Sequence, residues 1–110
     1  MTDTPPPGGL LAHLAQISGV TPDTERARRA ADLIDRARQA LRYHDGHPNG
    51  AWSIGEQVAV ALILNNHDAL DRLDYTTAQA AERVAGDMFY PPVDLNGWLD
   101  SIRAQLTAED

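Results

Sequence analysis

Apolar residues recur at intervals of three and four along most of the chain, which is the spacing of one face of an α-helix. The pattern predicts four main helices, at 22–43, from 54 to about 65, from 77 to about 87 and from 95 to about 106. Leu70 and Leu73 indicate one further helical turn or a bent continuation of the preceding helix. A short helix near the start is predicted from an apolar edge formed by Leu10, Leu11, Leu14 and Ile17 and ended by Gly19.

Capping residues stand at the predicted helix starts. Thr21 precedes Pro22, and threonine caps a helix while proline at the first helical position loses no needed hydrogen bond. Two further starts have the spacing of a capping box, namely Ser53 with Glu56 and Thr76 with Gln79. Asp94 is expected to cap the last helix.

The segment 58–64 is apolar on every face and therefore fits either a buried helix or a buried strand. The cap at Ser53, together with Ala59 and Ala61, favours a buried central helix. In the helix 22–43 the stripe expected to face the core contains Ala27, Ala30, Ala31, Ile34, Ala37 and Leu41.

The predicted fold class is all-α, a compact single-domain bundle of five to six short helices with a disordered N-terminus rich in proline and glycine. Residues 1–9 are assigned to this lead-in, 10–107 to a single helical domain and 108–110 to a tail. The segment 44–50, with its glycine, proline and asparagine residues, is the clearest break and joins two halves.

Composition excludes several kinds of chemistry. The 110 residues include no cysteine, so disulfides, thiolate zinc sites and a cysteine nucleophile are absent. Sixteen acidic residues against nine arginines give a net charge of −7, which repels nucleic acid and anionic lipid unless the arginines cluster. There is no apolar run of signal-peptide or membrane-span length, so a cytoplasmic protein is expected. No cofactor is predicted.

The arginines do cluster. Six of the nine lie at 26–42 among four acidic residues of the same predicted helix, which gives it a charge of +2 against −9 for the rest. This polarity suits an acidic partner or a second copy of the chain. A solvated helix with local ion pairs, for example between Asp32 and Arg36, is the alternative.

Histidines in two loops are the candidates for metal binding or acid–base chemistry. His44, Asp45 and His47 stand in one loop, and His67 and Asp68 in another. Their spacing matches no metal motif, and the chain has neither a serine nucleophile elbow nor a glycine-rich phosphate loop. We therefore predict no metal site and no enzymatic activity, with a small metal-dependent enzyme as the least favoured alternative.

The segment 75–84 resembles the first helix of excisionase-type helix-turn-helix proteins, in which a threonine-capped, alanine-rich helix precedes a recognition helix. The resemblance implies DNA binding. However, Met88–Pro92 replaces the short turn, and the next helix offers only Arg103 for phosphates and bases. An acidic helical regulator that contacts nucleic acid is thus an alternative function.

The run 52–64, with Tyr75 and Trp98 later in the chain, also resembles small uncharacterised helical proteins of actinobacteria and their phages. That resemblance implies no activity and transfers no functional residue. Because aromatic residues are scarce, we expect Trp52 and Trp98 to anchor the core.

The leading functional hypothesis is a non-enzymatic protein-interaction module, either a phage-encoded protein that acts on a host protein or a small homo-oligomer. The segment 88–93 places apolar side chains on a loop stiffened by two prolines, which suits a contact surface, although it could also merely cover the core. The interaction residues predicted on these grounds are Phe89, Tyr90, Arg28, Arg36 and Arg38.

Overall fold

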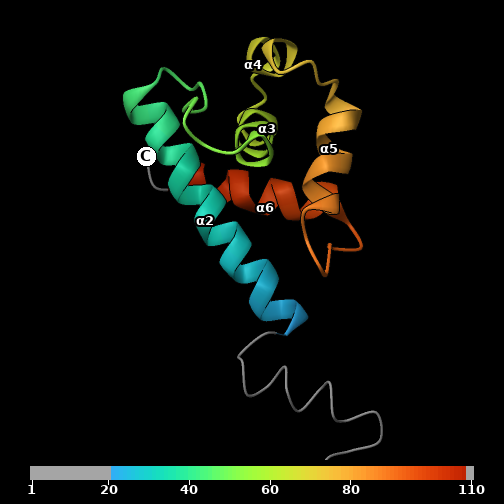
Figure 1. Ribbon diagram of the computed structural model, residues 1–110. Coiled ribbons are helices and arrows are strands. Elements are labelled where there is room, and N and C mark those ends of the chain that lie inside the picture. The colour runs from blue at the N-terminus through green and yellow to red at the C-terminus, as the bar shows by residue number, and fades with distance from the viewer. Residues whose placement is uncertain (1–20, 109–110) are drawn as a thin grey trace, which may run out of the picture.

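The computed structural model describes residues 21–108, and this part of the chain is helical with no strand (Figure 1). The predicted all-α fold class is confirmed. The helices are α2 (Pro22–Tyr43), α3 (Ile54–Ile63), α4 (His67–Arg72), α5 (Thr77–Gly86) and α6 (Leu95–Ala108). The lead-in predicted at 1–9 and the helix predicted from Leu10 to Ile17 lie outside the described residues.

Helix α3 is the centre of the bundle and packs against α2, α4, α5 and α6 (Figure 1). Every residue from Val58 to Ile63 is buried, which is why the sequence of this helix is apolar on all faces. The helix assignment is confirmed over the strand alternative. Trp52 and Trp98 pack against the same core as partly buried side chains, as expected.

The long helix α2 turns a different face to the core from the one predicted. Its buried residues are Leu33, Ile34, Ala37 and Ala40. The predicted stripe is wrong at Ala27, Ala31 and Leu41, which are exposed. The buried residues all lie in the C-terminal half of α2, so Ala27 and Ala31 lie before the first of them. Within that half the buried face is rotated, because Ala40 is buried instead of its neighbour Leu41.

The predicted caps are present. Thr21 accepts from the Thr24 amide, and both capping boxes form with the expected partners. The Asp94 carboxylate accepts from the Gly97 amide at 3.0 Å, where α6 begins. These local hydrogen bonds satisfy amides that have no partner inside a helix.

The break between α2 and α3 is fixed by a reversal of the backbone. Gly46 has a φ of +79°, in the left-handed region that favours glycine. The Asn66 side chain, from just before α4, donates to the Gly46 carbonyl at 2.9 Å. This contact ties the loop to the core.

Helix α6 holds the end of α3 through one arginine. Arg103 donates to the carbonyls of Leu62 and Ile63, at 2.8 Å each, and so satisfies groups that a helix end leaves free. Among the helices of the described part, none has the length and apolar character needed to cross a membrane.

Candidate functional site

The loop between α5 and α6 exposes large apolar side chains at its tip. Phe89 is 90% exposed and Val93 is fully exposed, whereas Met88, which precedes Phe89, is buried. Exposed large apolar side chains that are grouped together mark contact sites more often than scattered ones do. Met88 thus turns inward while Phe89 and Val93 face solvent.

Two hydrogen bonds clamp the backbone of this loop to the first turns of α2. The Arg26 Nε donates to the Tyr90 carbonyl at 2.9 Å, and the Tyr90 amide donates to the Glu25 carboxylate at 3.1 Å. Pro91 and Pro92 follow at once and fix φ at both positions. Both backbone polar groups of Tyr90 are thus engaged, and the aromatic tip is held in one place.

A cavity of about 430 Å³ lies between this loop and α2. It is lined by Glu25, Arg28, Arg29, Asp32 and Phe89. We call it the Phe89 cavity. Arg28 is exposed, and no carboxylate of the described residues pairs with it.

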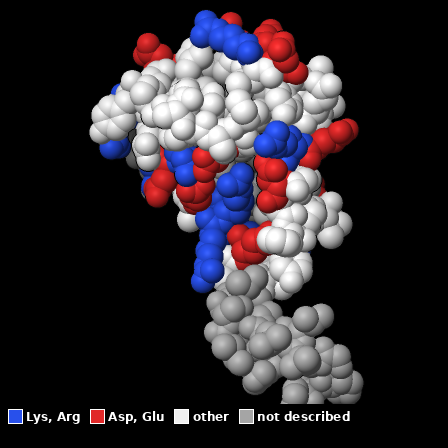
Figure 2. Space-filling view, in the orientation of Figure 1, with Lys and Arg blue, Asp and Glu red and all other residues white. Residues whose placement is uncertain are grey.

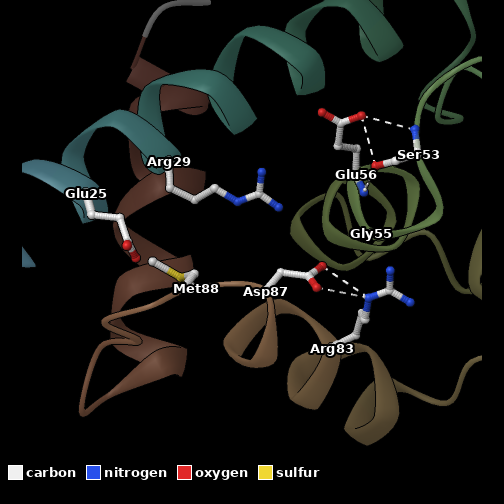
Figure 3. Close-up of a pocket in the computed structure, with 8 residues that line it drawn as sticks. All are labelled: Glu25, Arg29, Ser53, Gly55, Glu56, Arg83, Asp87 and Met88. Atoms are coloured by element: carbon white, nitrogen blue, oxygen red, sulfur yellow. Dashed lines mark hydrogen bonds and ion pairs between the residues drawn. The ribbon is translucent and has the colours of Figure 1, made fainter. Parts of the chain in front are cut away.

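A second, charged cavity of about 440 Å³ lies on the other side of Arg29, between α2, the start of α3 and the end of α5 (Figure 3). Its lining residues are Glu25, Arg29, Ser53, Gly55, Glu56, Arg83, Asp87 and Met88. In Figure 3 the Arg29 side chain extends from α2 into this space. Glu25 and Arg29 line both cavities, so the two cavities are adjacent.

Arg29 is only partly satisfied by its neighbours within the protein. Its Nε is buried and has no hydrogen-bond acceptor. Its Nη1 reaches the Asp32 carboxylate only at 3.8 Å, too far for a hydrogen bond. Because the Nε is closed to solvent, this unpaired donor is not itself open to a ligand.

Glu56, by contrast, is fully engaged. Its carboxylate accepts from the Ser53 amide and hydroxyl, at 3.0 Å each, and pairs with Arg36 at 2.6 Å. Partial burial raises its pKa, but the Ser53 hydrogen bonds and the charges of Arg36 and Arg29 outweigh burial and hold the pKa below its ordinary value. Glu56 is therefore an ionised structural group and a poor proton donor.

The far wall of the charged cavity is an ion pair at the end of α5. Arg83 Nε donates to both oxygens of Asp87, at 3.2 and 3.1 Å, and Nη1 donates to the Tyr75 hydroxyl at 3.0 Å. These hydrogen bonds raise the Arg83 pKa further above its ordinary range. The Asp87 carboxylate also lies directly against Gly55, a contact that a side chain at that position would obstruct.

The structure does not bring all five predicted interaction residues together. Phe89, Tyr90 and Arg28 lie at the Phe89 cavity or beside it. Arg36 instead joins α2 to α3: besides Glu56, it pairs with Asp32 at 3.0 Å and stacks on Trp52, with 5.2 Å between its guanidinium carbon and the ring centre.

Arg38 pairs with Asp35 at 3.4 Å, further along α2. Together with the predicted pair of Asp32 and Arg36, which is confirmed, this contact shows that local ion pairs account for much of the arginine cluster. Basic and acidic side chains lie beside one another at the top edge and in the lower half of the visible face, with a broad uncharged area between the two groups (Figure 2). White atoms also lie beside the lower run of blue ones, where Figure 1 places the loop after α5.

Two of the loop residues considered for metal binding meet. His47 Nε2 lies 3.3 Å from the Asp68 carboxylate, which also pairs with Arg72 at 3.1 Å. Within residues 21–108, no group of three potential ligands is placed to hold a metal ion.

In the helix-turn-helix comparison α6 takes the place of the recognition helix, and Arg103 is its one cationic residue. Arg103 of α6 donates to two carbonyls of α3 and pairs with Asp100 at 2.8 Å. Its guanidinium is therefore occupied inside the molecule. No described contact favours a nucleic-acid interface over a protein interface.

Sequence reasoning missed Glu25, Arg26 and Arg29 as parts of the site. Glu25 and Arg26 are separated from Tyr90 by 65 and 64 positions, and no periodicity links residues so far apart. The only local signal was the density of charge in the first turns of the predicted helix. Comparisons of the chain with protein-family models, with curated proteins and with solved structures found no match.

Proposed function

We propose that this protein is a non-enzymatic protein-interaction module that binds its partner through the Phe89 surface, defined as Phe89, Tyr90, Val93 and Arg28. The observation that supports this most directly is the exposed ring of Phe89 on a loop whose backbone is clamped to α2. A partner that buries this ring gains its apolar area without having to order the loop first.

The residue types of the surface agree with this role. Aromatic residues and arginine are enriched among the few residues that dominate binding energy at protein interfaces. Here an exposed phenylalanine, a tyrosine and an arginine that pairs with no carboxylate of residues 21–108 lie at or beside one cavity. The partner is a second protein, or a second copy of this chain, in the cytoplasm.

Site-specific photo-crosslinking tests the proposal. A photoreactive amino acid at position 93, on the surface, is compared with the same amino acid at position 43, where Tyr43 is exposed at the other end of α2. We expect a discrete covalent adduct from position 93 and none from position 43, in cells that express the full chain. The mass of the adduct distinguishes a second copy from another protein.

The matched control adds Phe89→Ser to the chain that carries the crosslinker at position 93. Because Phe89 is almost fully exposed, this substitution leaves the fold intact, which circular dichroism verifies. Loss of the adduct would support the surface as assigned. Equal adducts from positions 93 and 43, or an adduct that persists without Phe89, would contradict it.

A further inference from the structure

We propose that the Phe89 cavity accepts an acidic–apolar segment of the partner, in which an aspartate or glutamate stands next to an aromatic or large aliphatic residue. This inference rests on the proposed function and names the chemistry of the partner.

The cavity has an apolar side wide enough for one large side chain. The ring of Phe89 forms one part of it, and the aliphatic stems of Arg28 and Arg29 form another. A volume of about 430 Å³ lies in the range of pockets that enclose small ligands. It is small for a globular subunit, and it fits a side chain or two from a peptide segment.

The charges around the cavity leave an excess of cationic hydrogen-bond donors. Both acidic residues of the lining have partners: Glu25 accepts from the Tyr90 amide, and Asp32 is held by Arg36. Neither arginine of the lining is satisfied in the same way. Arg28 is exposed and has no carboxylate partner among the described residues. Arg29 pairs with Asp32 at 3.8 Å, and its Nε is buried and closed to a ligand, so Arg28 supplies the cationic donors open to one.

These two facts select the charge of the ligand. A carboxylate of the ligand pairs with the exposed Arg28 guanidinium through charge-assisted hydrogen bonds, whereas an ammonium group is repelled by it. The overall charge of −7 disfavours anions at long range, so the selection operates only at contact distance. A single carboxylate beside an apolar side chain matches this arrangement better than a polyanion does.

Phe89 is the only phenylalanine of the chain, so labelling with para-fluorophenylalanine places one fluorine nucleus at the cavity. The full-length labelled protein is titrated with the blocked dipeptides Ac-Asp-Phe-NH2 and Ac-Asn-Phe-NH2, which differ by one charge. We expect a saturable change in the fluorine NMR shift, with a dissociation constant about fivefold lower for the aspartate dipeptide, the gain expected of one exposed ion pair.

Two matched variants assign the preference to the cavity. Arg28→Gln should reduce the ratio of the two dissociation constants to near one. Arg42→Gln should leave the ratio unchanged, since Arg42 lies 14 residues further along α2, about 21 Å away. Arg42 also lacks a carboxylate partner among the described residues and contacts only the Tyr43 ring, at 6.0 Å.

Equal affinity for the two dipeptides would overturn the inference, as would a ratio that changes equally in both variants or no saturable shift at concentrations up to about 10 mM. None of these results affects the adduct expected from position 93. If the adduct forms and the charge preference is absent, the proposed surface stands and the partner chemistry is wrong. If the preference is present and no adduct forms, the cavity binds acidic–apolar ligands and the proposed cellular function fails.

Discussion

Gly55 is a glycine because of a neighbour from another helix. A Cβ at this position would collide with the Asp87 carboxylate, which Arg83 holds in place. Alanine is otherwise the better helix residue, by up to about 1 kcal/mol. We therefore expect Gly55→Ala to destabilise the protein in the natural sequence and to stabilise it when Asp87→Ala is already present.

Chemical denaturation of the four proteins of this double-mutant cycle measures the two effects. Both proteins that carry Asp87→Ala lack the ion pair to Arg83, so this loss cancels when the two are compared. A change in the sign of the Gly55→Ala effect on unfolding free energy is therefore the diagnostic result. An equal effect of Gly55→Ala in both backgrounds would show that Asp87 does not lie against α3 in solution.

The ionisation of Glu56 contributes to stability in a defined range of pH. Its pKa in the folded protein lies below the ordinary value of 4.5, so the contribution is complete above 4.5 and is lost as the pH falls through the lowered pKa. Glu56→Gln, which cannot ionise, should therefore lose less unfolding free energy than the natural protein on acidification from about pH 6 to about pH 3. Parallel curves for the two proteins would show that Ser53 and Arg36 do not stabilise the carboxylate.

At the level of elements, the caps determine where the helices begin. Thr76→Ala removes the hydroxyl that accepts from the Gln79 amide at 3.1 Å and should cost about 1 kcal/mol of unfolding free energy. Thr107→Ala is the matched control, since the Thr107 hydroxyl only donates to the Arg103 carbonyl within α6. It should have little effect or stabilise slightly. Thermal melts in which both variants behave alike would contradict the capping role of Thr76.

The difference between contacts made within a few residues and contacts made between helices explains how much of the fold the sequence could predict. Helix starts at Thr21, Ser53 and Thr76 were predictable because each cap acts within three residues. The rotation of α2, which exposes Leu41, depends on where other helices cross it. The contact of Arg103 with α3 spans about 40 positions and has no local signature.

For the candidate site, the sequence predicted the aromatic residues of the loop and Arg28 but not what holds them. An exposed Phe89 was predictable from a loop with two prolines. The clamp through Glu25 and Arg26 was not, because it depends on how α2 lies beside the loop. Arg36 was assigned to the partner surface on charge alone, and the structure shows the contacts with Trp52 and Glu56 that occupy it.

At the scale of the whole molecule, the same residue type has opposite roles at the centre and at the surface. Val58 is fully buried in α3, whereas Val93 is fully exposed in the loop. Val58→Asp should unfold the domain because it buries an unpaired charge, and Val93→Asp should leave it folded. Far-ultraviolet circular dichroism separates the two outcomes. A folded Val58→Asp protein would contradict the central position of α3.

The central claim is that an exposed aromatic surface is fixed in place before any partner binds. Nitrogen-15 NMR relaxation measures this directly at the backbone amides of Phe89, Tyr90 and Val93. We expect order parameters of about 0.8, close to those of α2, and a decrease at Tyr90 when Glu25→Ala removes the acceptor of its amide. Order parameters below about 0.6 across this loop in the natural protein would contradict the claim.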